Sequence, residues 1–145
     1  MPNRAGLLKD AVPGAFVGLA AGLVAGGLAA LVGQPLGWAL VTTVALGLPL
    51  GAFGGGFGLL VAAGVLPAGR FAPVALYWLV AFPLARLVHE ITVGLVLTGQ
   101  FRTPPDLAGF LAYQGIVSLG WAIGFLWLHE RVAMRLRDRA ATASR

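Results

Sequence analysis

The chain has 145 residues, of which 59% are hydrophobic and only 10% are charged, whereas an average soluble domain carries about 25% charged residues. This composition excludes a soluble enzyme, an intrinsically disordered chain and a nucleic-acid-binding domain. The 22 glycines do not recur at every third position, which excludes collagen. With no cysteine, the chain has neither disulfides nor thiolate metal sites. We therefore interpret it as an all-α integral membrane protein.

Four apolar stretches are long enough to cross a bilayer, which requires about 20 residues of helix. They cover residues 11–32, 36–66, 74–97 and 107–128. The sequence thus predicts a four-transmembrane-helix bundle over 11–130, with a cytoplasmic N-terminal segment (1–10) before it and a basic cytoplasmic tail (131–145) after it.

The second stretch is unusually long and has helix-weakening residues at its centre. Pro49 removes one helical hydrogen bond, and the glycines at 54–56 make the backbone easy to unwind. A tilted, kinked helix fits this pattern. A discontinuous helix that exposes backbone groups to a site, as in transporters, fits it as well. The sequence leaves both open.

The basic residues predict the orientation, because lysine and arginine are retained on the cytoplasmic side of a membrane. Eight of the ten flank the spans on one predicted side: Arg4, Lys9, Arg70, Arg131, Arg135, Arg137, Arg139 and Arg145. Only Arg102 falls on the other side. We therefore expect a cell-membrane protein with both termini in the cytoplasm. The arginine-rich tail suits anionic lipid headgroups, and no nucleic-acid partner is expected.

Glycines recur at helical spacing along three of the spans and predict close helix contact. Rows of small residues let two helix backbones approach closely within a membrane. The rows consist of Gly14, Gly18, Gly22 and Gly26 in the first span, Gly51 and Gly55 in the second, and Gly120 and Gly124 in the fourth. The predicted contact is either within one chain or between copies of it.

Three ionisable residues lie inside the third span. Arg86, His89 and Glu90 are three and four residues apart, so they share one helix face. Ionisable groups in a bilayer are costly and normally face a partner or a water-filled cavity. Arg86 and Glu90 can neutralise each other, which leaves His89 as the group able to titrate near neutral pH.

Counting residues from the predicted membrane surface places this cluster opposite polar residues of the fourth span. At 1.5 Å per residue, His89 is level with Gly115. The predicted pocket combines Arg86, His89 and Glu90 with Tyr113, Gln114 and Ser118. The alternative is an interhelical clamp without chemistry.

No other pattern indicates a catalytic or metal site. His89 and His129 are each followed by Glu, but neither begins an H-E-x-x-H motif. We expect no metal and no cofactor. Asp10 and Asp106 fall at predicted helix starts, where N-capping accounts for them.

These features leave three functions open. The first is a membrane subunit of a larger transport or enzyme complex. The second is a small homo-oligomeric transporter or channel with a proton- or anion-responsive site at Arg86, His89 and Glu90. The third, a membrane-embedded lipid-modifying enzyme, requires more convergent polar groups than the chain offers, so an enzyme is the least favoured. The bilayer is the expected surrounding, and a larger membrane protein or further copies of the chain are the expected partners.

Overall fold

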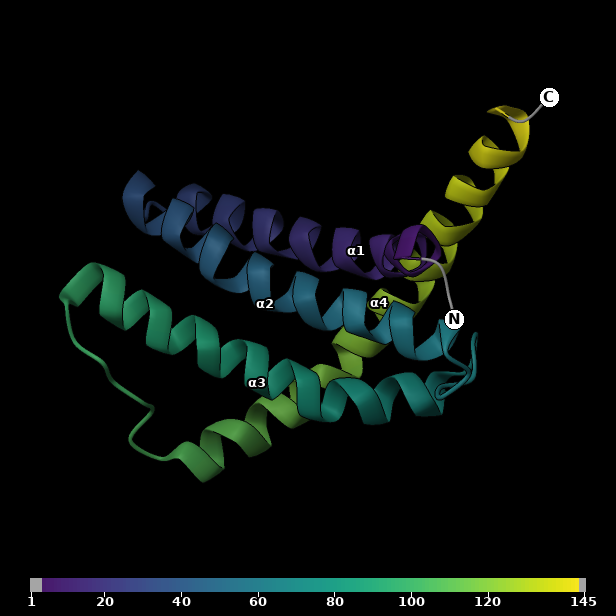
Figure 1. Cartoon of the computed structure of the whole chain (residues 1–145). Helices are drawn as coiled ribbons and strands as arrows, with labels where there is room; N and C mark the ends of the chain where they lie inside the picture. Colours follow the sequence, from purple (N-terminus) through teal and green to yellow (C-terminus); the bar gives the residue numbers. More distant parts are fainter. Residues whose placement is uncertain (1–3, 144–145) are drawn as a thin grey trace.

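The computed structural model describes residues 4–143, apart from the side chains of residues 4, 5 and 7. This part of the chain forms four long helices: α1 (Arg4–Leu31), α2 (Leu36–Ala62), α3 (Phe71–Thr98) and α4 (Leu107–Ala143) (Figure 1). Each of them is long and apolar enough to cross a membrane. The prediction of an all-helical chain with four helices suited to a multi-pass membrane protein is confirmed. Of the basic residues expected in the cytoplasm, Arg145 and the side chain of Arg4 lie outside the described part.

The helix ends follow local chemistry. Asp106 precedes α4 and its Oδ1 accepts a hydrogen bond from the backbone N–H of Gly109 at 2.9 Å, so the predicted cap is confirmed. The same prediction for Asp10 is wrong. The α1 helix already begins at Arg4, which places Asp10 inside the helix. Hydropathy marks where a helix enters the apolar layer, and a helix can begin well before that point.

The α2 helix is continuous through Pro49 and the glycines at 54–56. Of the two forms left open by the sequence, the discontinuous helix is therefore not the one observed. A proline removes a single backbone hydrogen bond, and α1 lies alongside this whole region. The helix ends at Ala62, and Gly64 in the following turn has a φ of 73°, a left-handed conformation that favours glycine.

The helices form a close pair and a crossing pair. The most extensive contact joins α1 to α2, and the next joins α3 to α4. In Figure 1, α1 and α2 run side by side, whereas α4 crosses behind α3 at a steep angle and extends beyond the other helices. Both ends of the chain and the α2–α3 connection lie at one end of the molecule (Figure 1). The crossing of α4 leaves the second half of α3 away from it.

Glycines lie where the α1 and α2 backbones meet. A Cβ atom added to Gly14 would collide with the backbone of Gly54, and one added to Gly18 would collide with that of Leu50. Gly22 lies in the same way against Gly47, and the Cβ position of Gly26 is taken by the Thr43 side chain. By contrast, apart from their own stretch of helix, no atom of the described residues lies within 4 Å of the Cβ positions of Gly120 and Gly124 in α4.

An aromatic cluster joins α2, α3 and α4. Trp78, Phe57 and Phe125 are fully buried and pack edge to face, with the Trp78 and Phe125 ring centroids 4.7 Å apart. Trp121 of α4 packs against Trp78 of α3 with a centroid distance of 5.3 Å. The Tyr77 hydroxyl donates a 2.6 Å hydrogen bond to the backbone carbonyl of Phe53, which ties α3 to α2.

Replacing Tyr77 by phenylalanine is expected to lower the free energy of unfolding by about 1 kcal/mol, the usual net contribution of one hydrogen bond. The ring keeps its edge contact with Phe57, so only the bond to the Phe53 carbonyl is lost. Tyr113→Phe is the matched control, because Tyr113 is 63% exposed. Thermal unfolding in detergent compares the two. An equal effect of both substitutions would contradict a structural role for the Tyr77 hydroxyl.

Candidate functional site

Arg86, His89 and Glu90 form one connected group on α3, which we call the α3 polar cluster. Nη2 of Arg86 donates to Oε1 of Glu90 at 2.7 Å. The two residues are one helical turn apart and form an ion pair. Nη1 of Arg86 lies 2.7 Å from Nδ1 of His89. Arginine thus bridges the other two side chains, as their spacing predicts.

The hydrogen bond from Arg86 sets the tautomer of His89. Arginine has only donors and stays protonated, so Nδ1 of His89 is the acceptor and a neutral ring carries its proton on Nε2. That Nε2 atom is buried and has no hydrogen-bond partner among the described residues. A buried donor without a partner costs free energy. The cluster therefore contains one unused donor next to an ion pair.

The ion pair lies near the middle of α3 but is not enclosed by this chain. The side chains of Arg86 and Glu90 are 22% and 39% exposed, whereas His89 is buried. Where α4 crosses α3 (Figure 1), Trp121 packs against Trp78 and Phe82, which precede the cluster in the helix. A Cβ on Gly115 would lie 3.4 Å from Cδ1 of Leu79, ten residues before His89.

Among the described residues of the predicted pocket, hydrogen bonds connect Arg86 with His89 and Glu90. Tyr113 is exposed, while Gln114 and Ser118 are buried in α4. The Ser118 hydroxyl donates to the Gly115 carbonyl of its own helix at 2.6 Å. Within residues 4–143 no hydrogen bond or ion pair links these three residues to the α3 polar cluster. Counting depth assumes parallel helices, and the steep crossing of α4 shifts its residues along α3.

We compared the chain with protein families, curated proteins and solved structures. No match was found in any of the three. Any functional argument therefore depends on the residues themselves.

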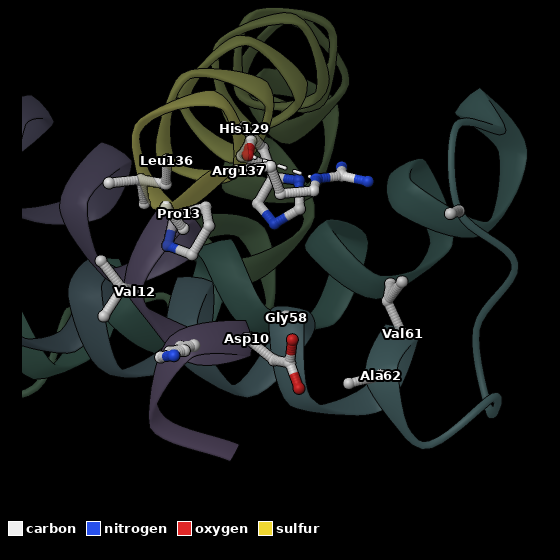
Figure 2. A pocket seen from close by; sticks show the side chains of 13 residues that line it. Asp10, Val12, Pro13, Gly58, Val61, Ala62, His129, Leu136 and Arg137 are labelled. Carbon is white, nitrogen blue, oxygen red and sulfur yellow. Dashed lines mark hydrogen bonds between the residues drawn. The ribbon is translucent and has the colours of Figure 1, made fainter. Parts of the chain in front are cut away.

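A second site, which sequence reasoning missed, lies at the end of the molecule that holds both termini. A cavity of about 650 Å³ opens between α1, α2 and α4. Its polar lining residues are Lys9, Asp10, His129 and Arg137, and most of the rest are apolar. Figure 2 shows the His129 ring pointing from α4 toward Asp10 and Gly58, with Arg137 beside it.

From the sequence, Lys9 indicates orientation, Asp10 a helix cap and Arg137 a basic tail, and no pattern connects them with His129. The available signal was the charged pair at 9–10, directly before an apolar run, with a histidine and arginines after the last one. Only the crossing of α4 over the start of α1 brings these segments together. In the part of the chain described here, no three residues of the His, Cys, Asp or Glu types gather as metal ligands.

Proposed function

We propose that this protein is a membrane subunit that docks its α3 polar cluster against another membrane-embedded polypeptide, in a larger transport or enzyme complex. The observation that carries this proposal is the partly exposed Arg86–Glu90 ion pair near the middle of α3. Transferring charged groups to hydrocarbon costs about 2.5–3.5 kcal/mol each, even on insertion scales. A polar surface on a partner removes much of this cost.

The neighbouring surface supports the same conclusion. Arg86 and Glu90 are both partly exposed, so two residues of the cluster present charged atoms at the surface of α3. A stable monomer in lipid would keep such a pair inside its own bundle.

The proposal also includes the way the subunit is built and oriented. We propose that glycine rows hold α1 against α2, which is supported by the backbone atoms found at the Cβ positions of Gly14, Gly18 and Gly22. Gly120 and Gly124 are open within the chain and suit contact with another polypeptide. We further propose that the termini face the cytoplasm at the cell membrane, because most basic residues lie at that end.

A homo-oligomeric transporter or channel is the second candidate, and one observation favours it. Nε2 of His89 is a buried polar atom without a partner, beside charged groups that open on the surface of the chain. If copies of the chain met through this face, the α3 polar clusters of several copies would line one path, with the Arg86 and Glu90 side chains at its surface. Such an arrangement would respond to protons or anions.

Single-cysteine cross-linking tests which molecule covers the cluster. The chain has no cysteine of its own, so each variant carries one thiol. Val93 lies three residues after Glu90 on the same helix face, and Leu95, which is 50% exposed, lies on the opposite side. Val93→Cys, labelled with a benzophenone maleimide and irradiated in native membranes, is expected to cross-link to a different, larger polypeptide. Leu95→Cys is the matched control and is expected to give no protein adduct.

The specificity of this cross-link depends on the ion pair. Adding Arg86→Leu and Glu90→Leu to the Val93→Cys chain is expected to abolish the protein adduct, while the chain still inserts into the membrane. An adduct with the mass of two copies would contradict the larger partner and support the homo-oligomer. Equal adducts from Val93→Cys and Leu95→Cys, or no protein adduct from either, would overturn docking through this face.

A further inference from the structure

The cavity between α1, α2 and α4 has the composition of an amphiphile site. Its walls are mostly apolar, with Val12, Val61 and Leu136 contributed by three different helices (Figure 2). Its volume of about 650 Å³ lies within the roughly 300–1,000 Å³ range of small-molecule pockets. Charged residues occur among the apolar ones, so a ligand that fills the cavity needs both an apolar and a charged part.

The charges of the cavity favour an anion. Lys9 and Arg137 both line it, and neither forms an ion pair with an acidic residue in the described chain. The Nε of Arg137 donates to the carbonyl of Ala133 at 3.3 Å, which holds the side chain beside the cavity. Asp10 is the single negative residue in the lining. It offsets one positive charge and can accept hydrogen bonds from hydroxyl groups.

The wall around His129 is rigid and holds a polar atom without a partner. The His129 ring stacks on Phe125 and meets the edge of Phe57, with centroid distances of 5.5 Å and 5.4 Å. Its Nε2 is buried and has no hydrogen-bond partner in the described residues. A ring fixed on two sides keeps the shape of the cavity on that side.

The position of the cavity identifies the source of the ligand. It lies where the apolar stretch of α1 begins, with Lys9 and Asp10 next to the start of the membrane span at Leu8. On α4, Arg137 follows the last strongly apolar residues of that helix. Lipid headgroups lie at this level of a bilayer, and basic pockets between membrane helices bind phospholipid headgroups.

We propose that this cavity binds one anionic phospholipid, with its phosphate against Lys9 and Arg137 and an acyl chain along the apolar wall. Asp10 selects a headgroup that carries hydroxyl groups and a single negative charge. The site is independent of the α3 polar cluster, which lies near the middle of α3, so its lipid occupancy is separate from the docking proposed above.

Native mass spectrometry of the purified protein in detergent tests this proposal with three probes: dioleoyl phosphatidylglycerol, dioleoyl phosphatidylcholine and inorganic phosphate. The expected result is one phosphatidylglycerol molecule per chain, bound at least about tenfold more tightly than phosphatidylcholine. Inorganic phosphate is expected not to bind at the same concentrations, because it lacks the apolar part. If phosphate bound as tightly as phosphatidylglycerol, the lipid would be the wrong ligand.

Two pairs of variants locate the site. Lys9→Gln with Arg137→Gln removes both unpaired cations of the lining. Since each basic residue near an anionic surface contributes about fivefold in affinity, the pair is expected to weaken phosphatidylglycerol binding about 30-fold. Arg135→Gln with Arg139→Gln makes the same change in net charge outside the lining and is expected to change binding little. Equal losses would mean that the arginine-rich tail attracts the lipid without this cavity, which would overturn the proposal.

Filling the cavity provides a test that does not alter charge. Ala133→Leu adds volume to the lining on α4, whereas Ala112→Leu makes the same exchange at an exposed position of the same helix. Ala133→Leu is expected to reduce phosphatidylglycerol binding at least about tenfold, with an unchanged melting temperature in detergent alone, and Ala112→Leu to leave it as in the wild type. Unchanged binding by the Ala133→Leu protein would contradict the proposed position of the acyl chain.

Discussion

Replacing Gly18 by leucine is expected to separate α1 from α2 and to leave little folded protein. The Cβ position of Gly18 is already occupied by backbone atoms of Leu50 and Gly51. Backbone atoms cannot rotate away as a flexible side chain does, so the two helices must move apart along their whole contact. Overpacking a well-packed interior already costs about 1–3 kcal/mol where side chains can adjust. We expect the cost here to exceed that range. The measurement is the fraction of monodisperse protein after detergent extraction, together with its melting temperature.

The Gly27→Leu variant is the matched control for this experiment. Gly27 lies in the same helix, but apart from the adjacent helix backbone no described atom lies within 4 Å of its Cβ position. The same exchange there is expected to leave the yield and the melting temperature close to those of the wild type. If Gly27→Leu lowered them as much as Gly18→Leu does, leucine in this helix would be harmful in itself, and contact with α2 would not be the cause.

Substitution of glycine by alanine distinguishes the effect of steric contact from the effect of helix propensity. Alanine is the better helix former by about 1 kcal/mol, so Gly→Ala stabilises a helix wherever space permits. At Gly55 an added Cβ would lie 3.5 Å from the Cβ of Ala15, an ordinary contact. We therefore expect Gly55→Ala to be tolerated and Gly18→Ala to be destabilising, although both face the same helix pair. Equal effects would contradict the geometry of the α1–α2 contact.

The number and order of the helices could be predicted from sequence because apolar stretches of membrane length are a one-dimensional property. The helix cap at Asp106 and the proline-containing connections could also be predicted, because each depends only on residues that are neighbours in the sequence. The angle of α4 could not be predicted. It depends on how Trp121 and Phe125 fit against Trp78, and this contact between distant segments has no periodic signature. The α4 helix itself continues through the polar tail as far as Ala143.

For the candidate sites too, features within one helix could be predicted, whereas contacts between helices could not. Arg86, His89 and Glu90 could be grouped from sequence, because positions three and four apart on a helix are neighbours whatever the tertiary structure. Their predicted neighbours on α4 depended on the helix angle, and the structure links none of them to the cluster by a hydrogen bond. The cavity near Lys9 and His129 combines the first and last helices. The sequence predicts that their ends lie on the same side of the membrane, but the contact between them depends on the angle of α4.

Removing the carboxylate of the ion pair is expected to lower the free energy of unfolding more than removing the guanidinium does. Glu90→Gln leaves the Arg86 guanidinium without its carboxylate near the middle of a membrane span. Arginine cannot lose its charge in a protein, so the cost is expected to be about 3 kcal/mol of unfolding free energy. Arg86→Leu leaves a carboxyl group instead, which can become neutral by binding a proton in apolar surroundings. That variant is expected to lose clearly less stability. Unfolding of the purified variants in mixed micelles measures both changes.

The double variant with Arg86→Leu and Glu90→Leu distinguishes a structural clamp from a docking site. Replacing both charges by apolar side chains of similar volume is often neutral or stabilising, because neither charge is left unpaired. If the pair serves docking, the double variant is expected to unfold like the wild type or later, and yet to lose its cross-link to the partner. A clamp that holds the chain together would give the opposite pattern, with a destabilised double variant that still cross-links. Equal stability losses in Glu90→Gln and Arg86→Leu would mean that water reaches the pair, because a guanidinium in contact with water bears no such penalty.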